Sequence, residues 1–388
     1  MSEEFKAKVR DISSLGLGIV DHPSGKVFFV PGTWVGDEGI FRIESEKKRY
    51  GHARLIKLET TSPVRVTPSC PHHGFEFGSC GGCPWMMVEY NEQLVAKTKF
   101  VSQAMKRANL LTSVDALKPI WASPKTLGFR NRAQFKTDGK RIGYVSAGSH
   151  EIAEIEDCLI LNDKCRDLLV GLRKQLPSEN WKASPGHDWN FIEIDDGLEA
   201  EAIKLNARQA FKQADEDQNL RMKSWLEDKI SNLSEKDRGP IVELFCGSGN
   251  FTEILSRFSS HQTLAVESTP HSLEKLKDRD LVNVEVLQAD IFLSESWGKI
   301  KSSMPEARVL VLDPPRIGFK SISKFIENFP SLQKIFYISC SIPDFIRDIS
   351  SLVGWELSEL QPVDQFPHTP HLELLAELTR REDAPQKA

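Results

Sequence analysis

The sequence predicts an α/β protein whose C-terminal part is a doubly wound, mainly parallel sheet. From Pro240 onward, short apolar runs alternate with helical stretches, which is the pattern of such a sheet. Three of these runs end in chemically useful groups: a glycine loop after Phe245, a carboxylate at Asp313 and a thiol at Cys340. Because open α/β sheets bind ligands outside the carboxyl ends of their strands, the three tips indicate one active site.

Length and composition set bounds on the whole chain. At 388 residues it should form roughly two to three domains. Apolar residues make up 40% and charged residues 27%, as in soluble globular proteins. No apolar run reaches the roughly 18 residues that span a bilayer, and the N-terminus has no apolar signal core. We therefore expect a cytoplasmic protein, monomeric and without membrane association.

Residues 1–60 are predicted to form a small β-barrel of the OB type. Short apolar runs such as 26–30 and 39–43 alternate with turn signals at Gly16, Gly25 and Gly32. Barrels of this type often bind nucleic acid. A barrel that only packs against its neighbours explains the spacing equally well.

Residues 61–205 are predicted to form a central α+β domain. A segment rich in Pro, Gly and Cys precedes a helix over 90–110, strands between 129 and 158, and a helix over 163–175. Between Lys97 and Arg141 there are 11 Lys or Arg residues and two acids. This local excess suits an anionic partner, although the net charge is −5. A solvated helix face followed by a loop is the simpler alternative.

Residues 206–388 are predicted to form the doubly wound domain. The expected strands span 241–245, 263–267, 284–288, 308–312, 334–339 and 372–378, with helices between the first four. A polar segment that contains Phe211-Lys212-Gln213 leads into this domain.

The glycine loop and two strand-end acids predict a nucleoside-type cofactor. Gly247 and Gly249 lie between a strand and a helix, where glycines let the backbone approach a ligand. Glu267 ends the next strand, where an acceptor for a ribose diol belongs, and Asp290 ends the third. The loop lacks the third glycine of a dinucleotide fingerprint. S-adenosylmethionine therefore fits better than NAD, which is the rival.

Asp313, Cys340 and Glu373 predict methyl transfer to carbon. In nitrogen-directed methyltransferases an aromatic residue follows the Asp-Pro-Pro tip, and here Arg316 stands in that place. Uracil C5 is a weak nucleophile unless a thiolate adds to C6, and a base must afterwards remove the C5 proton. Cys340 is the candidate nucleophile and Glu373 the candidate base. Taken singly, Cys340 could be an inert buried thiol and Glu373 a surface acid.

A second set of cysteines predicts a metal site. We do not expect a disulfide framework, because cysteines of cytoplasmic proteins are kept reduced. Cys70, Cys80 and Cys83 lie within fourteen residues. Cys158 is the better candidate for a fourth ligand and Cys165 the alternative. Four thiolates suit zinc or an iron–sulfur cluster, and the neighbouring His72 and His73 keep zinc open.

These motifs resemble the RNA uracil-5-methyltransferase family over nearly the whole chain. The matching segments are 245–251, 312–318, 337–340 and 366–373. The resemblance implies a Rossmann-like class I methyltransferase domain, an N-terminal barrel of the TRAM type and a central cluster-binding domain. It implies Cys340 as nucleophile and Glu373 as base. It also implies a cofactor site lined by Gln213, Phe245, Asn250, Glu267, Asp290 and Asp313. Ser341 departs from the family, which commonly has Asn there.

The resemblance is closest to the branch that methylates 23S rRNA and carries a [4Fe-4S] cluster. It therefore implies a cluster on Cys70, Cys80, Cys83 and Cys158, and RNA as partner, with the target uridine flipped out of the RNA. The gap between Cys70 and Cys80 is longer than the usual pattern. A tRNA uracil-5-methyltransferase, an RNA cytosine-5-methyltransferase and a non-catalytic RNA-binding cluster protein are the alternatives.

Overall fold

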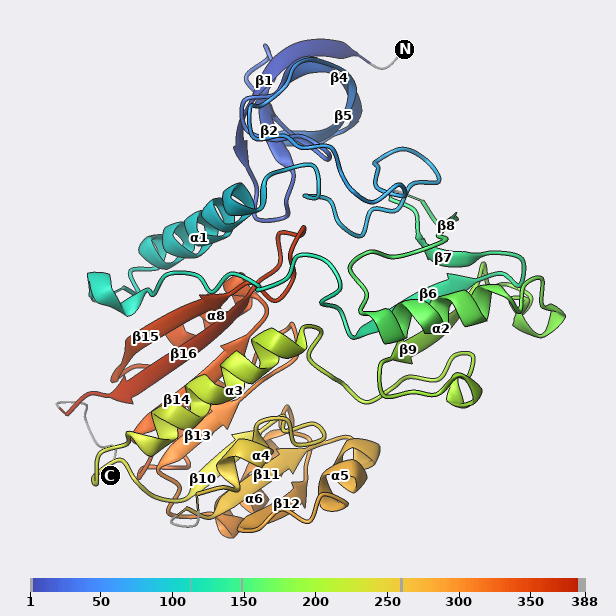
Figure 1. Ribbon diagram of the computed structural model, residues 1–388. Helices are drawn as coiled ribbons and strands as arrows, with labels where there is room; N and C mark the ends of the chain where they lie inside the picture. Colours follow the sequence, from blue (N-terminus) through green and yellow to red (C-terminus); the bar gives the residue numbers. More distant parts are fainter. Residues whose placement is uncertain (1–2, 112, 148, 259–260, 383–388) are drawn as a thin grey trace. The chain divides into compact units, whose positions relative to one another are not determined.

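The computed structural model describes residues 3–111, 113–147, 149–258 and 261–382 (Figure 1). The chain forms two compact units. The first comprises residues 1–97, 124–209 and 366–370, and the second comprises residues 98–123, 210–365 and 371–388. The three-part division at residues 60 and 205 stays a prediction. No described helix is long and apolar enough to cross a membrane.

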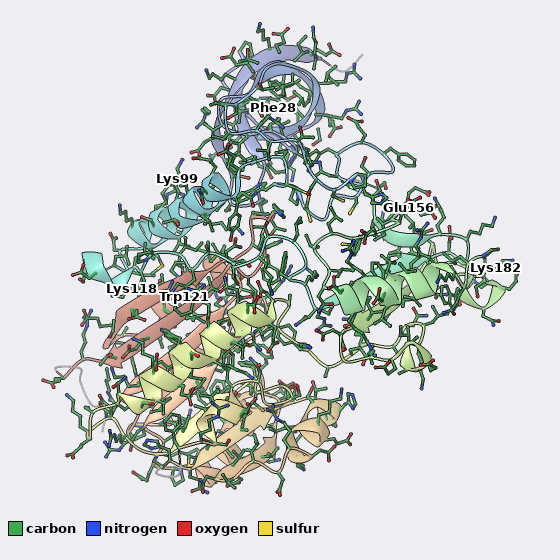
Figure 2. All side chains as sticks on the ribbon, viewed as in Figure 1. Phe28, Lys99, Lys118, Trp121, Glu156 and Lys182 are labelled. Carbon is green, nitrogen blue, oxygen red and sulfur yellow. The ribbon has the colours of Figure 1, made fainter. Side chains whose placement is uncertain are left out.

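The first unit begins with a closed barrel, as the sequence predicts. Its strand order is β1-β2-β3-β5-β4. The strands are β1 (Glu4–Ile12), β2 (Gly18–Asp21), β3 (Val27–Val30), β4 (Glu38–Glu46) and β5 (Tyr50–Thr60). Alternate side chains fill the interior, where Phe28 is fully buried (Figure 2).

A four-stranded antiparallel sheet with one helix forms the rest of the first unit's regular structure. Its order is β8-β7-β6-β9, and α2 packs on one face through an apolar cluster that includes Phe135, Leu168 and Ile192. The elements are β6 (Arg132–Thr137), β7 (Ile142–Val145), β8 (Ile152–Glu154), α2 (Asp163–Arg173) and β9 (Asn190–Asp195). Asn162 caps α2 by accepting from the backbone N–H of Cys165.

Helix α1 (Tyr90–Arg107) ends earlier than the predicted 90–110. Asn109 has a positive φ of 54°, a left-handed conformation that stops a helix. The boundary between the two units falls within α1, after Lys97.

The second unit is built on a seven-stranded sheet of order β12-β11-β10-β13-β14-β16-β15. Strands β10 to β14 are parallel, and β16 joins β14 antiparallel. The strands are β10 (Ile241–Leu244), β11 (Thr263–Glu267), β12 (Val284–Gln288), β13 (Val309–Leu312), β14 (Lys334–Ser339), β15 (Trp355–Val363) and β16 (Glu373–Arg380). Residues near Lys118 and Trp121 hydrogen-bond along β15 and so cover the edge of the sheet (Figure 2).

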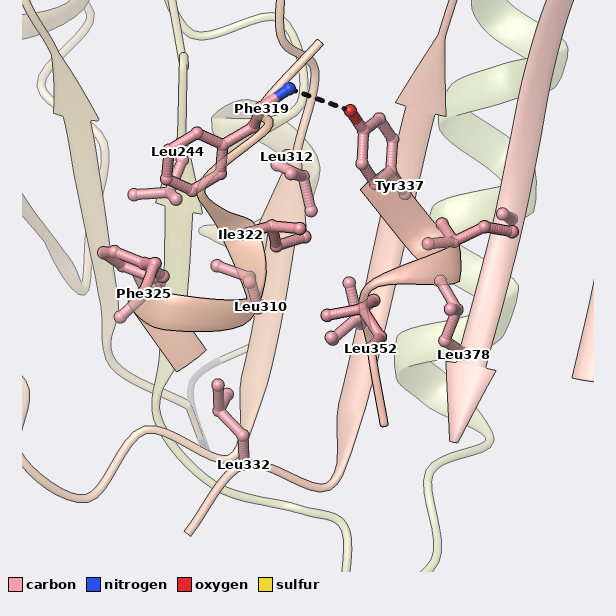
Figure 3. Close-up of a cluster of buried hydrophobic side chains, with 14 of the residues drawn as sticks. Leu244, Leu310, Leu312, Phe319, Ile322, Phe325, Leu332, Tyr337, Leu352 and Leu378 are labelled. Atoms are coloured by element: carbon pink, nitrogen blue, oxygen red, sulfur yellow. Dashed lines mark hydrogen bonds between the residues drawn. The ribbon is translucent and has the colours of Figure 1, made fainter. Parts of the chain in front are cut away.

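Helices cover both faces of this sheet. One face, with Leu244, Leu312 and Tyr337, packs against α6, α7 and α8. Figure 3 shows part of this core, with Ile322 and Phe325 of α7 beside the strands. The other face packs against α3, α4 and α5 through residues such as Trp225 and Phe336. The helices are α3 (Glu216–Ser231), α4 (Thr252–Leu255), α5 (Pro270–Lys277), α6 (Trp297–Ser303), α7 (Ile322–Ile326) and α8 (Ile342–Ser350).

The strands expected from the sequence are present with boundaries within about two residues, and the predicted fold class is confirmed. Four elements of this unit were not expected: α3, α7, α8 and β15. The loop predicted after Cys340 is only one residue long, because α8 begins at Ile342 with Pro343 in its first turn. Proline is compatible with that position, since the first helical N–H groups have no partner within the helix.

Candidate active site and thiol cluster

The carboxyl ends of β10, β11, β12, β13 and β14 meet at one edge of the sheet. The strand order reverses between β10 and β13, because β11 and β12 extend on one side and β14 on the other. Such a switch point leaves a crevice in which doubly wound folds bind ligands. The glycine loop follows β10, Asp313 follows β13 and Cys340 follows β14.

The glycine loop has an unusual backbone. Phe245, Gly247 and Gly249 all have positive φ, at 60°, 54° and 88°. A non-glycine residue in this region is strained, and such strain gathers at functional sites. A Cβ atom on Gly247 would find nothing within 4 Å, so the loop borders open space. A Cβ on Gly249 would lie 2.4 Å from Leu276, where the loop packs closely.

The two strand-end acids are fixed by backbone N–H groups. Glu267 accepts from Gly247 at 3.3 Å and from Ser268 and Thr269 at 2.8 Å each. Asp290 accepts from the backbone of Phe292 at 3.0 Å. Both carboxylates therefore stand at the sheet edge with oxygen lone pairs available for hydroxyl or amine donors.

Aromatic rings lie beside the glycine loop. The rings of Phe245 and Phe292 are 5.4 Å apart, and Phe245 also meets Phe319 edge-on at 5.8 Å. Phe292 is 46% exposed. An exposed aromatic residue next to a glycine loop offers a flat apolar surface. Its position two residues after Asp290 is the one signal for it in the sequence.

Amide side chains connect the remaining predicted cofactor residues. Gln213 donates to Asp313 at 3.4 Å, and Gln365 donates to Gln213 at 2.8 Å. Asn250 and Asn219 exchange two hydrogen bonds, at 2.9 and 3.1 Å. Asn219 and Gln365 were missed by the sequence reasoning, because each acts through a neighbour distant in sequence.

Cys340 and Glu373 are brought together by strand register. Ser339 pairs with Leu374 in the antiparallel ladder of β14 and β16. One position further along, Cys340 therefore stands opposite Glu373, the first residue of β16. Cys340 is partly buried and Glu373 is buried.

The site suppresses negative charge. Burial, together with the carboxylates of Glu373 and Asp313, raises the pKa of the Cys340 thiol to about 12, while Arg316 opposes them. Burial raises the pKa of Asp313 to about 7. Burial, with a smaller contribution from Asp313, holds the pKa of Glu373 well above its usual value. These three acids therefore lie close enough to influence one another, with the Arg316 guanidinium beside two of them.

The second cysteine set lines one cavity in the first unit. Cys70, Cys80, Cys83 and Cys158 all contribute to its wall. Cys165 does not line it. This residue lies in the first turn of α2, and its fully buried thiol donates to the carbonyl of Asn131 at 3.3 Å. The remaining lining residues are His72, His73, Gly82, Met86, Arg130, Tyr144, Ile155, Asp157, Leu159 and Ile160.

The chemistry of this cavity fits a soft cationic group. Burial raises the pKa of Cys80 to about 11, and it also raises the pKa values of Cys83 and Cys158. Each thiol further disfavours ionisation of its neighbours. A bound metal centre would offset this repulsion, because metals bind thiolates and neutralise their charge.

Among the described residues, no three His, Cys, Asp or Glu side chains converge closely enough to hold a single ion. His72 already accepts from the backbone N–H of Glu156 through Nε2, at 3.1 Å. His73 lines the cavity, and its Nε2 has no hydrogen-bond partner.

The Phe366–Pro370 segment, which precedes Glu373, belongs to the first unit. The backbone N–H of Trp85 donates to the carbonyl of His368 at 2.9 Å. Gln93 accepts from the backbone N–H of His368 at 2.8 Å and donates to the carbonyl of Trp85 at 3.0 Å. Trp85 is two residues after Cys83, so this contact joins the thiol-bearing loop to the segment that leads to Glu373. The sequence did not predict it.

The electrostatics of Cys340 predict an alkylation profile. Iodoacetamide should modify Cys340 about tenfold faster for each pH unit between 7 and 10, without a plateau, because the thiolate fraction keeps rising well below the pKa. The rate is measured on the Cys340 peptide by mass spectrometry. N-acetylcysteine in the same tube serves as control and should level off near its own pKa. A Cys340 plateau at or below pH 9 would contradict the raised pKa.

No family model matches the chain. It is 43% identical over 378 residues to a protein of Nitrosomonas europaea described as an uncharacterised RNA methyltransferase, covering 96% of each chain. It is 27% identical to the 23S rRNA (uracil(1939)-C(5))-methyltransferase RlmD of Shewanella woodyi, covering 97% of this chain and 96% of that one.

Among solved structures, the tRNA (uracil-54, C5)-methyltransferase of Pyrococcus abyssi, bound to S-adenosyl-L-homocysteine, has the same fold. The TM-score is 0.71 at 20% identity, covering 96% of this chain and 99% of that one. With these relatives matched over nearly their whole length, the chain belongs to the RNA uracil-5-methyltransferase family.

Proposed function

We propose that this enzyme methylates C5 of a uridine in 23S rRNA through a covalent bond between Cys340 and C6. The observation that carries the proposal is the register of β14 and β16, which puts a thiol and a carboxylate at facing positions. Methylation at C5 needs this pair: a nucleophile that adds to C6 and a base that removes a proton from C5.

S-adenosylmethionine is the proposed methyl donor. The open space beside Gly247 accommodates a ligand, and the carboxylates of Glu267 and Asp290 suit ribose hydroxyls or amines. Phe245 and Phe292 offer an apolar surface for an adenine ring. Gln213, Asn250 and Asp313 complete the proposed cofactor residues. The methyl group is bonded to the sulfonium sulfur of the donor. When that bond breaks, the donor leaves as S-adenosylhomocysteine.

Cys340 makes the uracil ring reactive. The Cys340 thiol releases its proton to solvent, and the resulting thiolate adds to C6 and breaks the C5–C6 double bond. C5 thereby gains the electron pair that takes the methyl group. The raised pKa of Cys340 keeps the thiol protonated in the free enzyme. Arg316 is the cation that lowers this pKa, and it therefore favours the thiolate when the reaction begins.

Glu373 completes the reaction. After methylation C5 still carries its proton, which the Glu373 carboxylate removes, and the C5–C6 double bond re-forms as the Cys340 thiolate leaves. Burial raises the pKa of Glu373, which makes its ionised form a stronger base than an exposed carboxylate.

The choice of 23S rRNA rests on two features. Relatives that act on 23S rRNA match the chain from end to end. The four-thiol cavity is the other feature, and we propose that Cys70, Cys80, Cys83 and Cys158 bind a [4Fe-4S] cluster there. A cluster is larger than one ion, so its ligands need not converge on one point. We further propose that residues 1–60 and 61–205 form the RNA-binding and cluster domains, and residues 206–388 the methyltransferase domain.

Replacing the nucleophile should abolish the reaction. Cys340→Ala should lower turnover on a 23S rRNA transcript by about four orders of magnitude or more, since an uncatalysed C5 has no route to the methyl group. The assay measures 5-methyluridine in digested RNA. Unchanged binding of S-adenosylmethionine by the variant is the control for folding. Parental activity in Cys340→Ala, or methylation of cytidine alone, would refute the proposal.

Replacing the base should trap the intermediate. In the Glu373→Gln variant, Cys340 should still bond to C6 of ordinary RNA and C5 should still be methylated. The product should be released slowly, because an amide does not accept the C5 proton. A protein–RNA adduct should therefore accumulate on a denaturing gel and carry label from the methyl donor. The double variant Cys340→Ala/Glu373→Gln should form none. Normal release by Glu373→Gln would assign the base elsewhere.

Metal analysis tests the thiol cavity. Anaerobically purified protein should contain iron and acid-labile sulfide in about equal amounts, as a [4Fe-4S] cluster requires. Cys158→Ala should lose both, whereas Cys165→Ser should retain them because Cys165 lies outside the cavity. Zinc without sulfide in the parent protein would contradict the cluster, and equal loss in both variants would contradict the choice of Cys158.

A further inference from the structure

The two loops that carry the reactive groups extend beyond the hydrogen-bonded ladder that joins their strands. The pairing of β13 with β14 ends at Leu312 and Tyr337. Asp313 and Arg316 lie in the loop after β13, and Cys340 lies after the end of β14. Another contact must therefore fix the first loop against the second.

A buried carboxylate in α8 makes this contact. Asp348 is 0% exposed, and its Oδ2 accepts from the backbone N–H of Phe319 at 2.5 Å and from the Tyr337 hydroxyl at 2.7 Å. Its Oδ1 accepts from Arg347 at 2.8 Å through Nε and 2.6 Å through Nη2. Phe319 lies in the loop that follows Asp313, and Tyr337 lies three residues before Cys340. Figure 3 shows the backbone N–H of Phe319 beside the Tyr337 hydroxyl.

Arg347 extends the connection on both sides. Its Nη2 also donates to the carbonyl of Ile317, at 2.7 Å, one residue after Arg316. Its Nη1 donates to Asp344 at 2.5 Å, and Asp344 accepts from the Ser341 hydroxyl at 2.5 Å. Ser341 directly follows Cys340, so a continuous set of hydrogen bonds joins the loop of Arg316 to the neighbour of the nucleophile.

The glycine before Phe319 shows how closely the parts fit. Gly318 has a φ of 68°, and a Cβ on it would lie 2.3 Å from Oδ2 of Asp348 and 2.7 Å from Nη2 of Arg347. The carboxylate and the guanidinium thus press directly on the backbone of the loop. Any side chain at Gly318 would separate them from it.

The carboxylate of Asp348 does not stabilise helix α8. A carboxylate in the last turn of a helix faces the negative end of the helix dipole and is fully desolvated here. Four hydrogen bonds, including those from Arg347, compensate for this cost. Burial and the Asp348 carboxylate raise the pKa of Tyr337, which therefore remains a donor.

We propose that Asp348 is a positioning residue that aligns Cys340 with the Asp313–Gly318 loop for methyl transfer. The inference rests on the proposed function, in which Cys340 attacks uracil while Asp313 and Arg316 stand beside it. Asp348 touches no reacting atom. It acts through the loop backbone, Tyr337 and Arg347, and so determines how the two strand ends face one another when RNA and methyl donor are bound.

The test is Asp348→Asn in the full-length protein. Asparagine has nearly the same volume as aspartate, but an NH2 group replaces one of the two carboxylate oxygens. That NH2 group faces hydrogen-bond donors, so the variant loses the bonds either from Phe319 and Tyr337 or from Arg347. We expect kcat to fall about 10- to 100-fold, since small misplacements of reacting groups have effects of that size. KM for RNA and for S-adenosylmethionine should change less than about twofold. Trapping on RNA with 5-fluorouridine should slow in parallel.

Glu377→Gln is the matched control. Glu377 is a half-buried carboxylate on β16 that accepts from Lys229 and Lys334. It pairs with Phe336, four positions before Cys340. The Glu377→Gln variant should lower the melting temperature by about as much as Asp348→Asn does. Its kcat should equal that of the parent enzyme at temperatures well below melting. If Asp348→Asn does not fold, Tyr337→Phe removes one donor only and should lower kcat about threefold to tenfold.

The outcomes separate the inference from the proposed function. An active parent enzyme together with an inactive Cys340→Ala supports the function before any Asp348 variant is compared. A normal kcat in Asp348→Asn, a fall matched by Glu377→Gln, or a change confined to KM would each overturn the positioning role. A fall in kcat and trapping rate seen only in the Asp348 and Tyr337 variants would support it.

Discussion

The antiparallel pairing of β16 with β14 is the constraint on which the candidate active site depends. A parallel sheet alone would gather only residues that follow strands. Because β16 runs the opposite way, its first residue meets the last residues of β14, and Glu373 stands opposite Cys340. A shift of one position would turn Glu373 to the other face of the sheet. The pairing from Lys334 to Ser339 therefore determines which side chains meet at the candidate active site, as well as the order of the strands.

The surroundings of these groups disfavour negative charge. Burial opposes ionisation of Cys340, Asp313 and Glu373. The Asp313 carboxylate adds to this effect at both Cys340 and Glu373. Perturbed acids gathered at a strand switch point are typical of functional sites. In the proposed reaction negative charge passes from the thiolate to the uracil ring, away from the carboxylates. The buried acids thus favour a mechanism in which the thiolate exists only while it attacks.

Burial gives the seven cysteines different characters. Four border one cavity, where a metal centre would relieve their mutual repulsion. Cys165 and Cys246 are buried within apolar clusters. Cys340 follows β14 at the switch edge and stands opposite Glu373. We therefore propose metal binding, packing or covalent chemistry for each thiol according to what surrounds it.

The sequence by itself determined the class of the fold and the strand tips. Apolar runs and turn residues predict the barrel and the parallel strands, because periodicity and loop chemistry are local properties. It did not predict α3, α7, α8 and β15, nor the roles of Asn219 and Gln365, whose partners lie elsewhere in the chain. Only the tertiary structure decided that Cys158 rather than Cys165 lines the cavity, and that Asp348 joins two loops, because both follow from packing between distant segments.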